Sequence, residues 1–191
     1  MSTEPTAKEL KAAAHQGRVE VRFHNIDELF DQMDPAPIEE RDLDLDAEEF
    51  ITSWAREIPR DANLRLQIDL PEDQRKREPE KFVQPAIKRF FEYKADMAGR
   101  EFKDLMRRGR INLIIGIAVL GACMLIRELM ARAGESAAQH EFHLAGEAII
   151  IIGWVAMWRP VEILLYEWWP VKARQRTYRR LSAMPVNIEY R

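Results

Sequence analysis

The feature that most constrains the fold is an apolar run at residues 111–126 (INLIIGIAVLGACMLI), in which Asn112 is the single polar residue. Leu129 and Met130 extend its apolar character. A helix of about 20 residues crosses a hydrocarbon core about 30 Å thick. The run therefore predicts a first transmembrane helix at 111–131. A buried helix of a soluble protein has the same composition, and this alternative stays open.

A second apolar run predicts a transmembrane helix at 144–167. Its part from 148 to 158 (AIIIIGWVAMW) is uninterrupted, but Arg159 and Glu162 follow within the run. An arginine costs about 2.5–3.5 kcal/mol at a helix centre and much less near an end, where its side chain reaches the interface. Arg159 lies about 10 Å below the aromatic residues that end the run, at about 1.5 Å per residue.

The residues after the second run are typical of a membrane interface. Aromatic rings collect at the boundary of a bilayer, and basic residues lie just outside it. The predicted interfacial anchors are Trp168, Trp169, Lys172 and Arg174, with Tyr166 in the same aromatic belt.

Charge predicts the orientation of the two helices. The formal net charge of −3 combines an acidic block at 1–80 with basic blocks at 81–110 and 170–191, which bracket the apolar part. Lysine and arginine accumulate in cytoplasmic flanks. Both termini are thus expected in the cytoplasm, with a short periplasmic connector at 132–143, in a multi-pass protein of a bacterial inner (plasma) membrane.

The polar part predicts a small cytoplasmic α/β domain at 17–98, preceded by a disordered segment at 1–16. Apolar and polar residues alternate at 18–23 and 64–69, which is typical of half-buried strands. A third alternating segment at 184–191 predicts a C-terminal strand that returns to the same sheet. The expected fold class is therefore an α/β domain with a three-stranded sheet plus an antiparallel two-helix transmembrane hairpin.

Capping signals predict the helices of this domain. Asn25 with Glu28, and Asp46 with Glu49, have the spacing of a capping box, and the first helix places Met33 on its apolar side. Further segments are a helix at 79–98 after a charged loop at 71–80, a basic juxtamembrane connector at 99–110 with weak points at Gly99 and Gly109, and a basic juxtamembrane helix at 168–183. Contact within the hairpin is expected through small residues, namely Gly116, Ala118, Gly121, Ala122 and Gly153.

No motif for nucleotide binding, hydrolysis or redox chemistry is present, so we expect no enzymatic activity and no cofactor. Asp42, Asp44 and Asp46 resemble the start of a calcium loop, but its later glycine and glutamate positions are not met, which favours an acid-capped helix. A helix would place His140, His143 and Glu147 on one face, where a zinc or copper site, a pH-sensitive histidine pair or a plain polar helix start are all consistent.

The most unusual segment is Trp158-Arg159-Pro160-Val161-Glu162. Proline removes a backbone donor, and ionisable groups inside a bilayer face protein or water. Arg159, Glu162 and Tyr166 share a stripe at i, i+3 and i+7. One interpretation is an internal Arg159–Glu162 pair that orients the helix. The other is a polar lining shared between protomers, as a conduction path or a lipid-headgroup site.

The strings DPAPIEERDLDLDAEEFI (34–51) and GWVAMWRPVEILLYEWWP (153–170) resemble a family of bacterial two-span inner-membrane proteins with no established function. The resemblance covers the cytoplasmic domain and both apolar runs. It implies an inner-membrane location and supplies no activity or site residues.

The function expected from the sequence is a non-enzymatic assembly or partner-binding component. A lone hairpin would expose Arg159, Glu162 and Asn112 to lipid, and a homo-oligomer covers them most simply. The alternative is an oligomeric ion or small-solute channel gated by the cytoplasmic domain. Other expected partners are anionic lipid headgroups at the basic flanks and a basic protein on the acidic stretch at 26–49, with no nucleic acid.

Overall fold

The computed structural model describes residues 17–38, 40–59, 62–133 and 139–191. It divides into two compact units. The first unit contains the residues up to 98 together with 173–191, and the second contains 99–172. The predicted disordered segment at 1–16 and the middle of the predicted connector, residues 134–138, lie outside the described residues.

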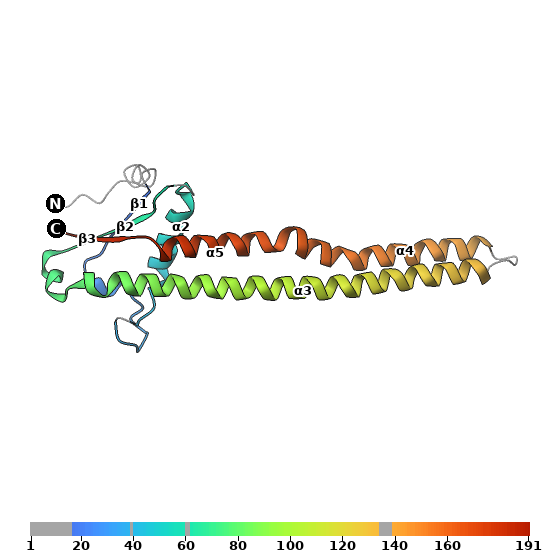
Figure 1. Ribbon diagram of the computed structural model, residues 1–191, viewed down its shortest axis with the longest axis horizontal. Helices are drawn as coiled ribbons and strands as arrows, with labels where there is room; N and C mark the ends of the chain where they lie inside the picture. The colour runs from blue at the N-terminus through green and yellow to red at the C-terminus, as the bar shows by residue number, and fades with distance from the viewer. Residues whose placement is uncertain (1–16, 39, 60–61, 134–138) are drawn as a thin grey trace. The chain divides into compact units, whose positions relative to one another are not determined.

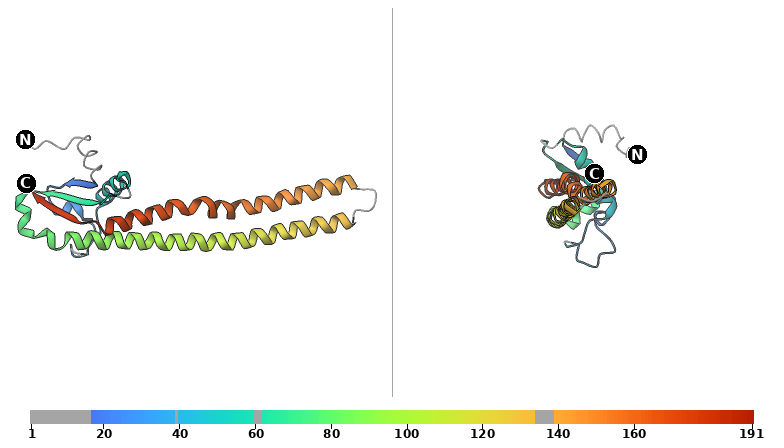
Figure 2. Two further views of the ribbon diagram at one scale, coloured as in Figure 1. Left: turned by 45° about the horizontal axis from the view of Figure 1, so that its top comes forward. Right: turned by 90° about the vertical axis from the view of Figure 1, so that its right-hand side faces the viewer.

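Three parallel strands form the sheet of the first unit, in the order β1 (Arg18–Arg22), β2 (Arg65–Leu70), β3 (Val186–Tyr190) (Figure 1). Figure 2 shows them side by side, with β2 between the other two. The register pairs Leu66 with Val19 on one side and with Val186 on the other. The prediction of a three-stranded sheet whose last strand comes from the C-terminus is confirmed.

Parallel strands need long crossover connections, and both connections of this sheet are long. The first contains the 3₁₀ turn η1 (Ile26–Leu29) and the helix α2 (Leu45–Glu57). The second, from β2 to β3, contains every residue of the second unit. The two apolar helices are therefore an insertion within one strand–crossover–strand connection, and a single sheet includes the chain on both sides of them.

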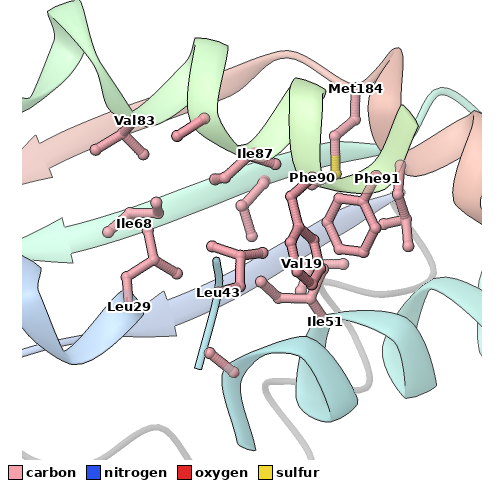
Figure 3. Close-up of a cluster of buried hydrophobic side chains, with 14 of the residues drawn as sticks. Val19, Leu29, Leu43, Ile51, Ile68, Val83, Ile87, Phe90, Phe91 and Met184 are labelled. Carbon is pink, nitrogen blue, oxygen red and sulfur yellow. The ribbon is translucent and has the colours of Figure 1, made fainter. Parts of the chain in front are cut away.

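The core of the first unit lies against one face of the sheet. Figure 3 shows Val19 and Ile68 from the strands facing Ile51 from α2 and Ile87 and Phe90 from the start of α3. The side chains of this cluster are at most 7% exposed. The C-terminal helix joins it through Tyr178, whose ring stacks on Phe91 with 6.1 Å between centroids.

The central strand β2 is buried on both faces, which corrects the prediction of a half-buried strand. Leu66, Ile68 and Leu70 are at most 2% exposed, and Gln67 and Asp69 on the other face are only 7% and 8% exposed. Side chains from both neighbouring segments, Arg22 of β1 and Arg191 after β3, reach over this second face. The Asp69 carboxylate is contacted by Gln67 Nε2 at 3.2 Å, by Arg191 at 3.5 Å and by Arg22 at 3.7 Å.

The expected helix after Asn25 is shortened to the single 3₁₀ turn η1. Asn25 caps it by accepting the N–H of Asp27, but the Glu28 carboxylate accepts the N–H of His24 rather than completing a capping box. The chain leaves the turn at Phe30, and Met33 is 90% exposed instead of lying on an apolar side. Apolar spacing alone was insufficient here, because Phe30 forms a β-bridge with Leu43.

The next helix, α2, begins two residues before the predicted position. Its N-cap is Asp44, whose carboxylate accepts the N–H groups of Asp46 and Ala47. Asp46 lies in the first turn, where its negative charge is favourable beside the unpaired N–H groups. The predicted acid-capped helix is therefore present, with Asp44 in place of Asp46 as the cap.

The predicted charged loop at 71–80 forms two 3₁₀ turns, η2 (Glu72–Arg77) and η3 (Pro79–Lys81), separated by Glu78 in a left-handed conformation. These turns contact the end of β3. The Tyr190 hydroxyl donates to the Glu80 carboxylate, and the Arg75 guanidinium lies 4.7 Å from the centroid of the Tyr190 ring. The bond from Tyr190 lowers the pKa of Glu80, while burial and the carboxylate raise the pKa of Tyr190 to about 12.

One continuous helix, α3 (Val83–Ala133), replaces the predicted helix at 79–98, connector at 99–110 and first apolar helix. Gly99 and Gly109 do not interrupt it, although each glycine costs about 1 kcal/mol relative to alanine. Gly109 has a packing role instead, because a Cβ at this position would lie 2.9 Å from Ile163 Cγ2. The glycine that suggested a weak point is a site of close approach.

The second unit consists of two antiparallel helices, the hairpin, formed by α3 from Gly99 onward and by α4 (Gln139–Glu162) with its continuation. The continuation is a π-helical turn, η4 (Ile163–Glu167), followed by α5 (Trp168–Ser182), which corresponds to the predicted basic helix at 168–183. Figures 1 and 2 show α3 and α4 side by side.

Two of the predicted small residues form the contact within the hairpin. A Cβ on Gly116 would lie 2.9 Å from Met157 Sδ, and one on Gly153 would lie 2.8 Å from Leu120 Cδ1. Gly121, by contrast, has no atom within 4 Å of the place its Cβ would take. Ala118 and Ala122 are also exposed, so these three predictions were wrong about the face.

Both helices are long enough and apolar enough to cross a membrane. Their apolar windows are mostly exposed, with 11% of the first and 17% of the second buried. The helix-to-helix contact therefore covers only one narrow stripe of each helix.

Candidate functional site

The candidate site begins at Pro160, within the last turn of α4. Proline has no N–H, so the carbonyl four residues earlier, that of Ala156, loses its usual donor. Pro160 itself is buried, and the place of a Cβ on Gly116 lies 3.4 Å from Pro160 Cγ and 3.2 Å from the Ala156 oxygen. The close approach of α3 at a glycine therefore covers the carbonyl that proline leaves without a donor.

The π-helical turn η4 follows Pro160 directly. Such a turn holds one residue more than an α-helical turn and is frequent at functional sites. The indole Nε1 of Trp168 donates to the Leu164 carbonyl at 2.9 Å, so a side chain supplies a donor to the widened turn.

The extra residue changes which side chains lie above one another. The sequence spacing placed Tyr166 on the stripe of Arg159 and Glu162, seven positions after the arginine. In the structure Glu167, eight positions after it, contacts Arg159, while Tyr166 is 70% exposed. The π turn accounts for the shift by one residue.

Three ionised side chains form what we call the Arg159 cluster: Arg159, Glu162 and Glu167. Arg159 Nη1 donates to Glu162 Oε2 at 3.0 Å and to Glu167 Oε1 at 2.5 Å. The side chains are 62%, 45% and 31% exposed, respectively. The internal Arg159–Glu162 pair is thus present, with a second carboxylate that gives the cluster a formal charge of −1.

The depth of the cluster follows from the contacts between the helices. Arg159 precedes Pro160, which lies beside Gly116, and Gly116 is six residues beyond Arg110, the last charged residue before the first apolar run. At about 1.5 Å per residue, Arg159 is about 9 Å inside the apolar section. Its guanidinium extends toward Glu167 and so toward the charged end, as expected for a snorkelling side chain.

The aromatic residues near this end differ in their surroundings. Trp168 contacts the rings of Phe102 and Trp169, at 6.3 Å and 5.7 Å between centroids. Lys172 Nζ lies 4.9 Å from the centroid of the Phe102 ring. Trp169 is 64% exposed, whereas Asn112, which a lone hairpin was expected to expose to lipid, is half-buried.

The acidic stretch at 26–49 is partly used by the fold. Asp27 pairs with Arg77, and this hydrogen bond lowers the pKa of Asp27 and raises that of Arg77. The Asp34 carboxylate accepts the N–H groups of Ala36 and Asp42, which lowers its pKa. These contacts give several of the acids a role in the fold that requires no partner protein. The docking of a basic protein on this stretch stays a hypothesis.

The side chains of His140 and His143 lie outside the described residues, and Glu147 is exposed. Among the residues that are described, no three His, Cys, Asp or Glu side chains come close enough to hold a metal ion. Cys123, which the apolar run places in its middle, is buried and has its Cβ 3.4 Å from the place of a Cβ on Gly153.

Sequence reasoning missed Glu167, which provides the shorter of the two contacts to Arg159. A signal was available, since Glu167 is an acid eight positions after the arginine with a proline between them. Only the backbone shows that the intervening turn is widened, and without that turn a residue at i+8 lies away from the stripe.

Comparison of the chain with family models, with curated proteins and with solved structures gives no match.

Proposed function

We propose that the chain is a two-span integral protein of a bacterial inner membrane, with both termini in the cytoplasm. In this proposal it is a non-enzymatic assembly or partner-binding component that forms a homo-oligomer through its hairpin. The observation that carries the proposal is the Arg159 cluster, which lies exposed within an otherwise apolar helix surface.

The membrane location is supported by apolar side chains that the hairpin leaves uncovered. Ile114, Ile117 and Met124 on α3 are 55–68% exposed, and Trp154 and Val155 on α4 are 69% and 67% exposed. Soluble monomers rarely expose a contiguous apolar patch larger than a few hundred Å². Acyl chains cover such a surface without further protein contacts.

The orientation is supported by the basic residues that bracket the hairpin at 100–110 and 172–180. The positive-inside rule places such flanks in the cytoplasm, and anionic headgroups of the inner leaflet attract them. The sheet supports a cytoplasmic position of both flanks at once, because β2 and β3 are neighbours in one sheet although the whole hairpin lies between them in sequence.

The oligomer follows from the cost of charged groups in hydrocarbon. Arg159 is about 9 Å inside the apolar section, Glu162 and Glu167 lie successively nearer its charged end, and the two carboxylates share a single guanidinium nitrogen. Within the described residues no other ion pair to Arg159 is present, so its remaining donors are open to a second protomer. Polar side chains that meet between helices stabilise association in membranes.

The test is the mass of the protein in lipid nanodiscs by native mass spectrometry. Arg159→Ala leaves the carboxylates of Glu162 and Glu167 without their cation and is expected to shift the oligomer toward monomer. The matched control is Arg132→Ala, which removes the exposed ion pair between Arg132 and Glu128 in the last turns of α3. This pair has the same length, 3.0 Å, and its removal is expected to leave the mass unchanged.

A monomeric wild-type protein, or an oligomer that Arg159→Ala leaves intact, would contradict the proposal. The exposure of three ionised groups in one cluster also favours the second candidate, an oligomeric channel gated by the cytoplasmic domain. It predicts ion currents in reconstituted bilayers that change in Arg159→Ala and Glu162→Ala, and bilayers without current at any pH or tension would exclude it.

A further inference from the structure

We propose that a cavity at the beginning of the sheet binds a phosphate group, carried by an anionic lipid or by a small soluble compound. The cavity lies within the first unit, so the inference concerns neither the Arg159 cluster nor the hairpin-mediated oligomer. It rests on the lining of the cavity, on one arginine that backbone carbonyls hold in place, and on a second arginine whose charge the fold does not neutralise.

The cavity has a volume of about 380 Å³ and lies between two segments of the first unit. Residues 62–65 lead into β2, and residues 183–185 join α5 to β3. Leu64 and Met184 belong to the hydrophobic core and supply an apolar part of the lining. Small-molecule sites have volumes of about 300–1,000 Å³, with an apolar lining and a few polar groups. The cavity has both properties.

The polar side chains of the cavity favour an anion. Arg65 and Arg180 line it together with Asn63, and no Asp or Glu is among the described residues of the lining. A guanidinium donates two parallel hydrogen bonds to a phosphate, and the side-chain amide of Asn63 provides a further donor. Because a phosphate carries several acceptor oxygens, it can bind both guanidinium groups at once.

The protein itself fixes the position of Arg180. Its Nη2 donates to the Pro59 carbonyl at 2.9 Å and to the Ala62 carbonyl at 3.4 Å. These two bonds leave the donors on Nη1 and Nε, and no hydrogen bond within the described part of the chain uses them. A side chain that is already held loses less conformational entropy on binding, which favours association with a ligand.

Arg65 lacks a counter-ion of its own. The register of the sheet pairs it with Arg18 of β1, and like charges directly opposite one another are destabilising. Arg18 forms an ion pair with Glu20, whereas none of the acids that the structure describes pairs with Arg65 or with Arg180. An anion in the cavity would offset the two remaining positive charges.

A bound phosphate would connect the last turn of α5 with the beginning of β2. The backbone already joins these segments, because the Leu66 N–H donates to the Pro185 carbonyl at 3.0 Å. A ligand that contacts Arg65 and Arg180 adds a second link at the same place. Since the cavity exists only in the folded unit, binding is expected to stabilise this unit against unfolding.

The first experiment is thermal unfolding of the full chain in a nonionic detergent, with inorganic phosphate replacing chloride at constant ionic strength. Constant ionic strength separates binding from the screening of surface charges. The wild type is expected to show a melting temperature that rises with phosphate and reaches saturation of the site, as mass action requires.

Two variants and a matched control locate the site. Arg180→Ala and Arg65→Ala are each expected to weaken phosphate binding about tenfold or more, because each removes charge-assisted hydrogen bonds. Arg65→Ala removes no ion pair among the described residues, so it keeps the test valid if Arg180→Ala fails to fold. The control Arg179→Ala removes the same charge from the same turn of α5 but lies outside the lining, and is expected to bind as the wild type does.

The second experiment identifies the source of the phosphate. Native mass spectrometry measures the lipid retained by the full chain after release from nanodiscs that contain phosphatidylglycerol or phosphatidylcholine. Retention of phosphatidylglycerol that is lost in Arg65→Ala and kept in Arg179→Ala assigns a lipid headgroup to the cavity. Stabilisation by inorganic phosphate without such retention assigns a soluble phosphate compound.

The inference is overturned if the wild type shows neither saturable stabilisation by phosphate nor retention of lipid that depends on Arg65. It is also overturned if Arg179→Ala weakens binding as much as Arg65→Ala, because the effect would then follow net charge rather than the cavity. The oligomer is measured separately, by native mass in Arg159→Ala, so either proposal can fail without the other.

Discussion

The two ends of α3 contrast in what their apolar side chains contact. In the first unit Ile87 and Phe91 are 1% and 0% exposed, whereas in the second unit Ile115 and Ile117 are each 55% exposed. The amino acids are of the same kind, and the helix is continuous between them. In the first unit the protein provides apolar surroundings for these side chains, and in the second the hairpin leaves them uncovered.

The contrast extends to polar groups. The buried Asp69 of the first unit has contacts from Gln67, Arg22 and Arg191. The Arg159 cluster of the second unit contains internal ion pairs but is exposed. The buried carboxylate of the first unit is thus surrounded by polar partners, whereas the hairpin exposes its charged cluster on an apolar surface.

The largest expected effect is removal of the strand that closes the sheet. Deleting residues 185–191 removes the five-residue β3, and at about 1 kcal/mol per ladder hydrogen bond the loss is on the order of 5 kcal/mol. This is comparable with the stability of a small domain. Limited proteolysis should show the first unit cleaved while the hairpin helices persist, and an unchanged digestion pattern and melting temperature would refute the role of the strand.

The next effect compares one substitution at two positions of the same helix. Ile87→Ala in the protein core is expected to cost about 2–5 kcal/mol. Ile117→Ala, at an exposed position of the hairpin, is expected to stay within about 0.5 kcal/mol. Chemical denaturation of the full chain in detergent micelles measures both, and equal losses at the two positions would show that Ile117 is also enclosed by protein.

A smaller effect concerns the contact between the helices. Gly116→Val and Gly153→Val place side-chain atoms where Met157 and Leu120 lie, at an expected cost of about 1–3 kcal/mol. Gly121→Val is the control, because its Cβ meets nothing within 4 Å. Thermal unfolding of the hairpin helices in detergent should separate the two classes, and a Gly121→Val variant as unstable as the others would reveal a further contact on that face.

The smallest effect is the pH dependence at the end of β3. Burial and the bond to Glu80 raise the pKa of Tyr190 from 10.0 to about 12, so the folded chain holds this proton more tightly. The stability it contributes is present below pH about 10 and is lost as the pH rises from about 10 to about 12. The lowered pKa of Glu80 acts at acidic pH. The stability that it contributes is lost as the pH falls through the range in which this carboxylate becomes protonated.

Tyr190→Phe is expected to cost about 1 kcal/mol at neutral pH and to flatten both dependences. The phenolate absorbance of wild type minus Tyr190→Phe measures the Tyr190 titration directly. A midpoint near pH 10 would contradict the hydrogen bond to Glu80.

Periodicity was sufficient to predict most elements. Alternation located all three strands, and two long apolar runs located the hairpin, because these patterns depend only on which face a side chain takes. Which strand is central depends on pairing between distant segments, so the burial of Gln67 and Asp69 was not accessible. The 3₁₀ turn at Ile26–Leu29 was likewise missed, because the contact of Phe30 with Leu43 overrides helical spacing.

The residue types of the candidate site were predictable from the sequence, but which of them contact one another was not. Arg159, Pro160 and Glu162 stand out in an apolar run, and their pairing follows from helical spacing. Glu167 replaces Tyr166 because a π turn adds a residue, which depends on backbone geometry rather than on composition. Small residues likewise mark the contact between helices, but only packing shows that Gly116 and Gly153 face the partner helix while Gly121 does not.

The central claim, that the hairpin crosses the bilayer with both ends in the cytoplasm, is tested most directly by cysteine labelling. In a Cys123→Ala background, a membrane-impermeant maleimide is applied to intact spheroplasts carrying Ser136→Cys or Ser182→Cys. The account predicts that Ser136→Cys is labelled at once and Ser182→Cys only after permeabilisation. Labelling of both positions only after permeabilisation, with the chain recovered in the aqueous fraction, would contradict it.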